Sequence, residues 1–182
     1  MRPSVFGPLR SMKPALFVQD IQNVWLYDPD SNQDLRRSLE KRLTAINKAI
    51  DWFRMRKLPI VVGYTEEREH GLLPGTKPFE VPGSVRIKKT DYAVTKRHAN
   101  AFGNPKLGRY LKSKGCDTLV ITGLSASGCV LATYFGAFDW EIRPYLLKGC
   151  VASHKEEHVR FAEEICETIT LRDIGTAVRK PR

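Results

Sequence analysis

The chain has 182 residues, of which 42% are hydrophobic and 27% charged, with a formal net charge of +10. This length is enough for one full core and short for two, so we expect a single domain over residues 1–182. No apolar run approaches the roughly 20 residues that span a bilayer, and no secretory signal pattern opens the chain, so we expect no membrane partner.

Predicted strands alternate with predicted helices along the chain. Short apolar segments predict strands at 15–19, 59–64, 91–95, 118–122, 142–147 and 168–171. Helical spacing of apolar residues predicts helices at 35–55, 105–114, 129–139 and 154–166. Residues 65–89, rich in glycine, proline and charge, predict a long loop, which in a compact domain is usually functional or disordered. The alternation favours a Rossmann-like α/β fold: a doubly wound, mostly parallel sheet with helices on both faces, in three α/β/α layers.

Basic residues gather at the two ends of the chain. Residues 1–14 contain Arg2, Arg10 and Lys13 without an acid, and residues 171–182 have a net charge of three, so the ends supply six of the ten excess charges. We interpret 1–13 and 172–182 as basic tails. Such tails can bind polyanions weakly but are more often just solvated, and no zinc-finger spacing or RNP-like aromatic motif accompanies them. We therefore do not expect a nucleic-acid partner.

The four cysteines, at 116, 129, 150 and 166, have no CxxC spacing. This argues against a disulfide framework or a structural zinc site and fits a reducing, cytoplasmic compartment. Cys129 is singled out by its position, because an apolar strand runs through a turn of small residues to the expected start of a helix there. A helix N-terminus favours a thiolate and offers N–H donors to an oxyanion, so Cys129 is a candidate nucleophile. A buried structural cysteine is the alternative.

Asp20, Lys96 and Cys129 each follow the end of a predicted strand. Ligands of parallel sheets bind beyond the carboxyl ends of the strands, so one crevice could hold all three side chains. The carboxylate could then take the thiol proton, the lysine could hold the carboxylate, and the thiolate could attack a carbonyl and form an acyl-enzyme that water hydrolyses. In the alternative interpretation Asp20 only caps a turn, and Lys96 belongs to a solvated basic run at 96–98.

Four segments, 15–25, 94–102, 122–133 and 146–158, carry a family likeness. The first has an apolar strand followed by Asp-x-Gln and an aromatic residue, Trp25; the second has Phe102 six residues after Lys96; the third surrounds Cys129. In order and spacing the chain resembles the isochorismatase-like cysteine hydrolases, the family that includes nicotinamidases. The resemblance implies Asp20 as base, Lys96 as its partner and Cys129 as nucleophile. It also implies a cis peptide bond before Ser125, and an oxyanion hole made by the N–H groups of Ser125 and Cys129.

The chain also departs from this family pattern. Residues 64–70 lack the Asp-x-His motif of metal-binding nicotinamidases, so we expect no metal or other cofactor, although three carboxylates and His70 leave a metal near 66–70 open. True isochorismatases lack the cysteine and hydrolyse a vinyl ether, so Cys129 argues against that reaction. Gly149 and Cys150 stand where the family has Asp and Ala, and Gln19 stands where an aliphatic residue is usual.

The sequence thus predicts a hydrolase that cleaves an amide-type C–N bond of a small molecule through a covalent acyl-enzyme. Trp25, Phe102 and Leu124 are candidates to line an apolar substrate slot, with ordinary packing as the alternative. We also expect a homo-oligomer. The alternative function is a catalytically idle binding or scaffold protein on the same fold.

Overall fold

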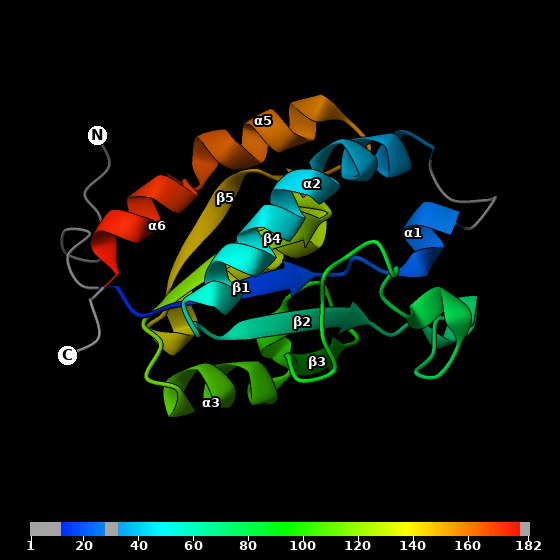
Figure 1. The fold of residues 1–182 in the computed structure, drawn as a ribbon. Helices are drawn as coiled ribbons and strands as arrows, with labels where there is room; N and C mark the ends of the chain where they lie inside the picture. The colour runs from blue at the N-terminus through cyan, green and yellow to red at the C-terminus, as the bar shows by residue number, and fades with distance from the viewer. Residues whose placement is uncertain (1–11, 28–32, 179–182) are drawn as a thin grey trace.

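A computed structural model describes residues 12–27 and 33–178. Six strands among these residues form one sheet in which all neighbours are parallel, in the order β3-β2-β1-β4-β5-β6 (Figure 1). The strands are β1 (Pro14–Gln19), β2 (Ile60–Thr65), β3 (Tyr92–Lys96), β4 (Thr118–Leu124), β5 (Arg143–Ala152) and β6 (Thr168–Ile169). The predicted doubly wound sheet is therefore confirmed, and the described sheet is wholly parallel.

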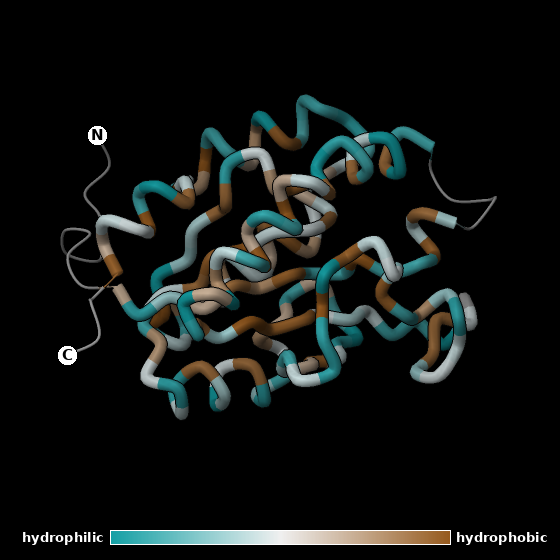
Figure 2. Tube along the Cα trace, viewed as in Figure 1, coloured by the Kyte–Doolittle hydropathy of each residue, from teal (hydrophilic) through white to brown (hydrophobic). Residues whose placement is uncertain are grey.

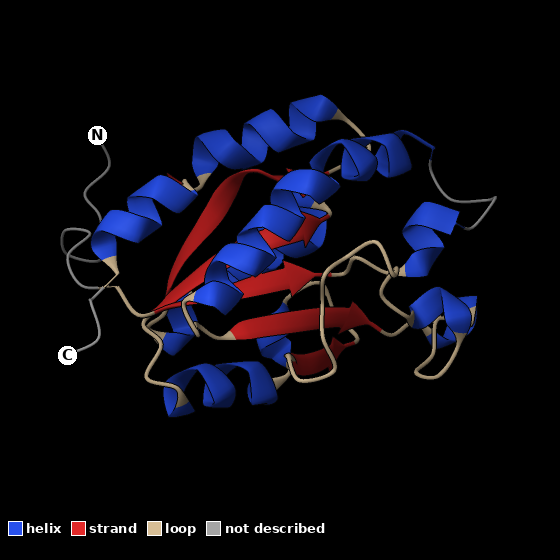
Figure 3. Ribbon diagram, in the orientation of Figure 1, coloured by secondary structure: helices blue, strands red, loops and turns tan. Residues whose placement is uncertain are grey.

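Helices cover both faces of this sheet (Figure 3). Apolar side chains of α2 (Gln33–Met55) and α6 (Leu171–Ala177) pack in one core, and α1 (Asn23–Tyr27) adds Leu26 to it. Those of α3 (Pro105–Ser113), α4 (Leu131–Gly136) and α5 (Glu156–Ile165) pack in the other. Among the described helices, none is both long enough and apolar enough to cross a membrane.

The central strand β1 serves both cores because successive side chains of a strand point to opposite faces. Leu16 and Val18 lie in the core beneath α2, and Ala15 and Phe17 lie in the other, all four fully buried. Figure 2 shows the result as a hydrophobic centre of the sheet under helices with hydrophilic outer turns. Because both faces of β1 are buried, its side chains are almost all apolar, which explains the continuous apolar run in the sequence.

Several boundaries differ from the sequence prediction. The helix expected at 129–139 is a π-helical turn (Ala126–Val130), then α4, then a 3₁₀ turn (Phe138–Trp140). The strand expected at 142–147 continues to Ala152. Residues 66–91 form the expected long connection, with two 3₁₀ turns, Arg68–His70 and Lys77–Phe79. The short helix α1 has no counterpart in the sequence prediction.

The C-terminal segment also differs from the expected basic tail, which begins at 172. Residues 171–177 form α6, which opens with a capping box between Thr170 and Asp173 and buries Ile174 completely. Met12, inside the other expected tail, is buried and donates its N–H to the carbonyl of Ala177. Both expected tails therefore include packed residues, while 1–11 and 179–182 lie outside the described residues.

The strand order reverses direction between β1 and β4, so the chain leaves these two central strands toward opposite edges of the sheet. Such a switch point opens a crevice at the carboxyl ends of the strands. Asp20 follows β1 there and Cys129 lies in the turn after β4.

Candidate active site

The structure brings the three candidate catalytic side chains together. The Nζ atom of Lys96, the last residue of β3, lies 2.9 Å from Oδ2 of Asp20 and 3.3 Å from Sγ of Cys129. The side chains of Lys96 and Asp20 are each only 2% exposed. The predicted convergence at the strand ends is confirmed as a placement, while the chemical roles of the three residues stay predictions.

Lys96 uses its three ammonium protons on three different acceptors. Besides Asp20 and Cys129, it donates a hydrogen bond to Oγ1 of Thr65, 2.8 Å away at the end of β2. A lysine ammonium has three donors and no acceptor, so this set is complete. Lys96 is therefore fixed in place and stabilises negative charge on either Asp20 or the thiol.

Asp20 is held in an unusual backbone conformation at the strand end. Its φ is 55°, in the left-handed region that aspartate tolerates better than most residues, and its N–H donates to the carbonyl of Gly63. Oδ2 accepts hydrogen bonds from Lys96 and from Nε2 of Gln19, at 3.2 Å. Oδ1 is buried and has no hydrogen-bond partner among the described residues. That oxygen is free to accept a proton.

Burial raises the pKa of the Asp20 carboxyl above its ordinary value, and the charge of Lys96 opposes this rise. A carboxyl with a raised pKa is a better proton acceptor than an ordinary one. Gln19 has a role that the sequence did not reveal: its polar side chain, fully buried, donates to this carboxylate.

The thiol of Cys129 is partly buried, and its environment differs from the one that its position suggested. Burial raises its pKa above the ordinary value, and the negative charge of Asp20 raises it further, while Lys96 lowers it. Burial and the charge of Asp20 therefore outweigh the expected preference for a thiolate at the start of a helix. A raised pKa favours the thiol over the thiolate, so Cys129 could act as a nucleophile only with the help of a base.

The turn before Cys129 has the expected backbone form. The peptide bond between Leu124 and Ser125 is cis, as the family resemblance implied. Oγ of Ser125 lies 3.0 Å from Oγ of Ser153, which is buried at the end of β5, and Oγ of Ser127 lies 3.0 Å from Nδ1 of His158 in α5. These contacts fix the turn whose N–H groups are the candidate oxyanion hole.

The sequence analysis noted Gln22 only as the last residue of the Asp-x-Gln motif, and it did not single out Thr65. Gln22 is fully buried and donates to the carbonyls of Thr65 and Phe79, and it accepts a hydrogen bond from the N–H of Thr65. Thr65 in turn receives the hydrogen bond from Lys96. The available signal was their position, since both are polar residues just at or after the carboxyl end of an apolar strand.

The three candidate substrate-lining residues lie in packed environments. Leu124 is buried in the core beneath α2, and Trp25 packs against that core from α1. Phe102 is buried in the other core, where its ring stacks with Trp140 at 6.2 Å between centroids. For these residues the structure supplies a packing role, and their contact with substrate stays a prediction.

The acidic segment 66–70 follows β2 and includes the 3₁₀ turn Arg68–His70. The carboxylate of Glu66 accepts hydrogen bonds from Arg68 and Arg97. Within the described part of the chain, no group of three or more His, Cys, Asp or Glu side chains is placed to hold a metal ion. His154 and His158 instead pack edge to face, 4.6 Å between ring centroids.

The doubly wound parallel sheet makes this an α/β protein with a cluster of polar side chains at the carboxyl ends of its strands. The isochorismatase domain matches residues 14–171 of the chain. The protein belongs to the isochorismatase family.

Individual relatives agree with this assignment. A Pseudomonas chlororaphis protein described as "Probable isochorismatase" is 27% identical over 179 residues, covering 88% of this chain and 84% of that protein. An isochorismatase-like hydrolase from Alkaliphilus metalliredigens superposes with a TM-score of 0.79, at 22% identity and 94% and 98% coverage of the two chains. N-carbamoylsarcosine amidase from Thermoplasma acidophilum superposes with a TM-score of 0.72, at 26% identity and 87% and 96% coverage.

Proposed function

We propose that this hydrolase cleaves an amide-type C–N bond of a small molecule with Cys129 as nucleophile, Asp20 as general base and Lys96 as their partner. The observation that supports this most directly is the buried Lys96 ammonium, which contacts both the Asp20 carboxylate and the Cys129 sulfur. The similarity to an amidase agrees with it.

In the first half-reaction, the thiol proton of Cys129 passes to Oδ1 of Asp20 while the sulfur attacks the amide carbon. The carbonyl π electrons move to oxygen, and the N–H groups of Ser125 and Cys129 stabilise the resulting oxyanion. When the oxyanion collapses, the C–N bond breaks and Asp20 returns its proton to the leaving nitrogen. The products of this step are an amine or ammonia and a thioester on Cys129.

In the second half-reaction, water attacks the thioester and gives its proton to Asp20. The C–S bond breaks, the thiolate takes the proton back, and the carboxylic acid product leaves. Lys96 keeps its hydrogen bonds to Asp20 and the sulfur while the negative charge moves between them. The cycle begins with the thiol proton on Cys129 and ends with a proton on Cys129 again, so each turnover consumes one water molecule and leaves the site unchanged.

The test is ammonia release from a panel of small primary amides by the purified protein, combined with intact-protein mass spectrometry to detect the acyl-enzyme. Cys129→Ala should abolish both signals, and Cys116→Ala, which changes a buried cysteine away from the site, should preserve both. Ammonia release that survives in Cys129→Ala would overturn the proposed mechanism. A folded protein that binds amides without hydrolysing any would support the idle binding protein instead.

A further inference from the structure

Gln19, the last residue of β1, is a polar residue whose side chain is fully buried. Successive side chains of a strand alternate between faces, so position 19 is on the same face of β1 as Ala15 and Phe17, which lie in the core that α3, α4 and α5 cover. An aliphatic residue is usual at this position of the family pattern. A buried glutamine has a desolvation cost that an aliphatic side chain would not have, so it requires a polar partner.

One end of the Gln19 amide has such a partner and the other end does not. Its Nε2 atom donates a hydrogen bond to Oδ2 of Asp20, 3.2 Å away. Its Oε1 atom is buried and has no hydrogen-bond partner among the described residues. Gln22 differs, because it uses both ends of its amide in three hydrogen bonds to the backbone. The hydrogen bonding of the Gln19 amide is therefore directed at the Asp20 carboxyl.

Two donors from different strands meet at one oxygen of this carboxyl. Oδ2 of Asp20 lies 2.9 Å from Nζ of Lys96, at the end of β3, and 3.2 Å from Nε2 of Gln19. The terminal torsion of an aspartate is broad, so a single donor would leave the carboxyl plane free to turn. A second donor from another direction fixes the plane, with Oδ2 between the donors and Oδ1 without a partner in the described structure.

The groups that face the Asp20 carboxyl determine how easily it ionises. Lys96 of β3 is the charged group, Cys129 is the other titratable group, and Thr65 of β2 is neutral. Burial raises the pKa of Asp20, while the charge of Lys96 and hydrogen bonds from Lys96, Thr65 and Gln19 lower it. Gln19 therefore stabilises the ionised carboxyl without placing a further charge beside the thiol.

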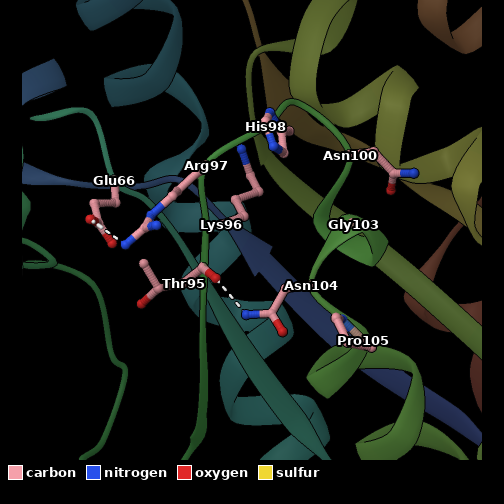
Figure 4. A pocket seen from close by; sticks show the side chains of 9 residues that line it. All are labelled: Glu66, Thr95, Lys96, Arg97, His98, Asn100, Gly103, Asn104 and Pro105. Atoms are coloured by element: carbon pink, nitrogen blue, oxygen red, sulfur yellow. Dashed lines mark hydrogen bonds and ion pairs between the residues drawn. The ribbon is translucent and has the colours of Figure 1, made fainter. Parts of the chain in front are cut away.

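A cavity of about 400 Å³ lies beside the end of β3, and its lining includes Lys96, Arg97 and His98 (Figure 4). Neither Gln19 nor Asp20 belongs to that lining. The Gln19 amide is thus not placed to contact a molecule in this cavity, and we expect it to act through Asp20.

We propose that Gln19 is a positioning residue for the base: its amide fixes the Asp20 carboxyl against Lys96, leaves Oδ1 as the oxygen that takes the thiol proton, and favours the ionised carboxyl. This inference rests on the proposed function, in which Asp20 is the base. Gln19 takes no part in the bond changes. An aliphatic residue at 19 would leave Asp20 more readily protonated, so Gln19 extends the working range of the enzyme to lower pH.

The test variant is Gln19→Met, which keeps the length of the side chain and removes the donor. The Asp20 carboxyl is titrated by ¹³C NMR in protein labelled at its aspartate carboxyl carbons, and its resonance is assigned by its loss in Asp20→Asn. We expect the midpoint to move to higher pH in Gln19→Met. The acidic limb of kcat/KM for the best primary amide of the panel should move the same way, because it follows the ionised base of the free enzyme.

On the pH plateau, kcat of Gln19→Met should fall about threefold or more while KM stays unchanged, since the base loses its orientation but the substrate loses no contact. Gln33→Met is the matched control, because Gln33 is exposed at the start of α2, and it should leave both the midpoint and kcat unchanged. Gln19→Leu is a second variant with the aliphatic kind of side chain that is usual at this position. It should fold and give the same shift.

A midpoint that stays in place in both Gln19 variants, or that moves equally in Gln33→Met, would overturn the inference. The NMR titration needs no substrate, so it separates this result from a failure of the proposed function. A wild type that hydrolyses no amide would overturn the proposed function, while a shifted midpoint would still support the action of Gln19 on Asp20. A shifted midpoint with an unmoved acidic limb would show that Asp20 is not the base and would overturn both.

Discussion

Gly123 of β4 lies directly against the carbonyl oxygen of Gln19 in β1, so closely that a Cβ atom on Gly123 would overlap that oxygen. The φ of Gly123 is also +104°, a conformation that residues with side chains rarely adopt. The glycine therefore allows the two central strands to approach each other just before Asp20 and the nucleophile turn.

This contact predicts that Gly123→Ala lowers the free energy of unfolding by about 2–4 kcal/mol, because both the overlap and the backbone strain must be relieved. The measurement is urea denaturation followed by circular dichroism. Gly83→Ala is the control, since no atom lies within 4 Å of its added Cβ and its φ lies outside the strained range. Equal stability of the two variants would contradict the described contact.

Cys129 should be the first cysteine to react with iodoacetamide in the native protein at pH 7.5. The other three cysteines are buried, and burial raises the pKa of Cys116 to about 11 and those of Cys150 and Cys166 to about 12. Their thiolate fractions at neutral pH are therefore very small. Peptide mapping over time gives the order, and labelling of any other cysteine before Cys129 would refute it.

Substitutions at Asp20 and Lys96 should shift the pKa of the Cys129 thiol in opposite directions. Asp20 raises that pKa and Lys96 lowers it, so Asp20→Asn should move the pH midpoint of alkylation down and Lys96→Met should move it up. Under the proposed mechanism both variants should nevertheless lose about 100-fold or more of the amide hydrolysis, because the first lacks the proposed base and the second lacks its partner. Midpoints that move the same way would show that the two charges do not act on the thiol separately.

Removal of residues 171–182 should destabilise the fold by about 3 kcal/mol or more, because it removes the buried side chains of α6 and its capping box. A shorter truncation that removes only 179–182 deletes two arginines and a lysine but leaves α6 intact, and it should be neutral. Thermal unfolding of both proteins distinguishes packing from charge. A stable protein without 171–182 would restore the interpretation of this segment as a solvated tail.

The sequence predicted the sheet because its buried strands are uninterrupted apolar runs, and it predicted the position of Asp20 and Cys129 because strand ends converge in parallel sheets. It did not predict α6, because only Leu171, Ile174 and Ala177 form its apolar side and charged residues and a glycine separate them. The direction of the Cys129 pKa shift could not be predicted from the sequence either. It depends on burial and on Asp20, which lies 109 positions away in the printed sequence.

Thr65 and Gln22 illustrate the same limit. Their hydrogen bonds join positions 43 residues apart, so no local pattern could assign them a place beside Lys96. The surroundings of Arg97 could not be predicted for a similar reason. Arg97 reads as part of a basic surface run until Glu66 and Arg68 are placed next to it.

Lys96 lies on the edge strand β3, so the contacts of its ammonium group depend on how readily that strand unfolds. β3 has five residues and pairs with β2 alone, whereas Asp20 and the Cys129 turn follow the two central strands. Short edge elements open at a lower free energy than the centre of a sheet. Detachment of β3 would withdraw Lys96 from Asp20 and Cys129, and the thiol would then lose the positive charge that lowers its pKa. Under the proposed function, a heated or mildly denatured population should therefore lose hydrolytic activity while most of its secondary structure persists.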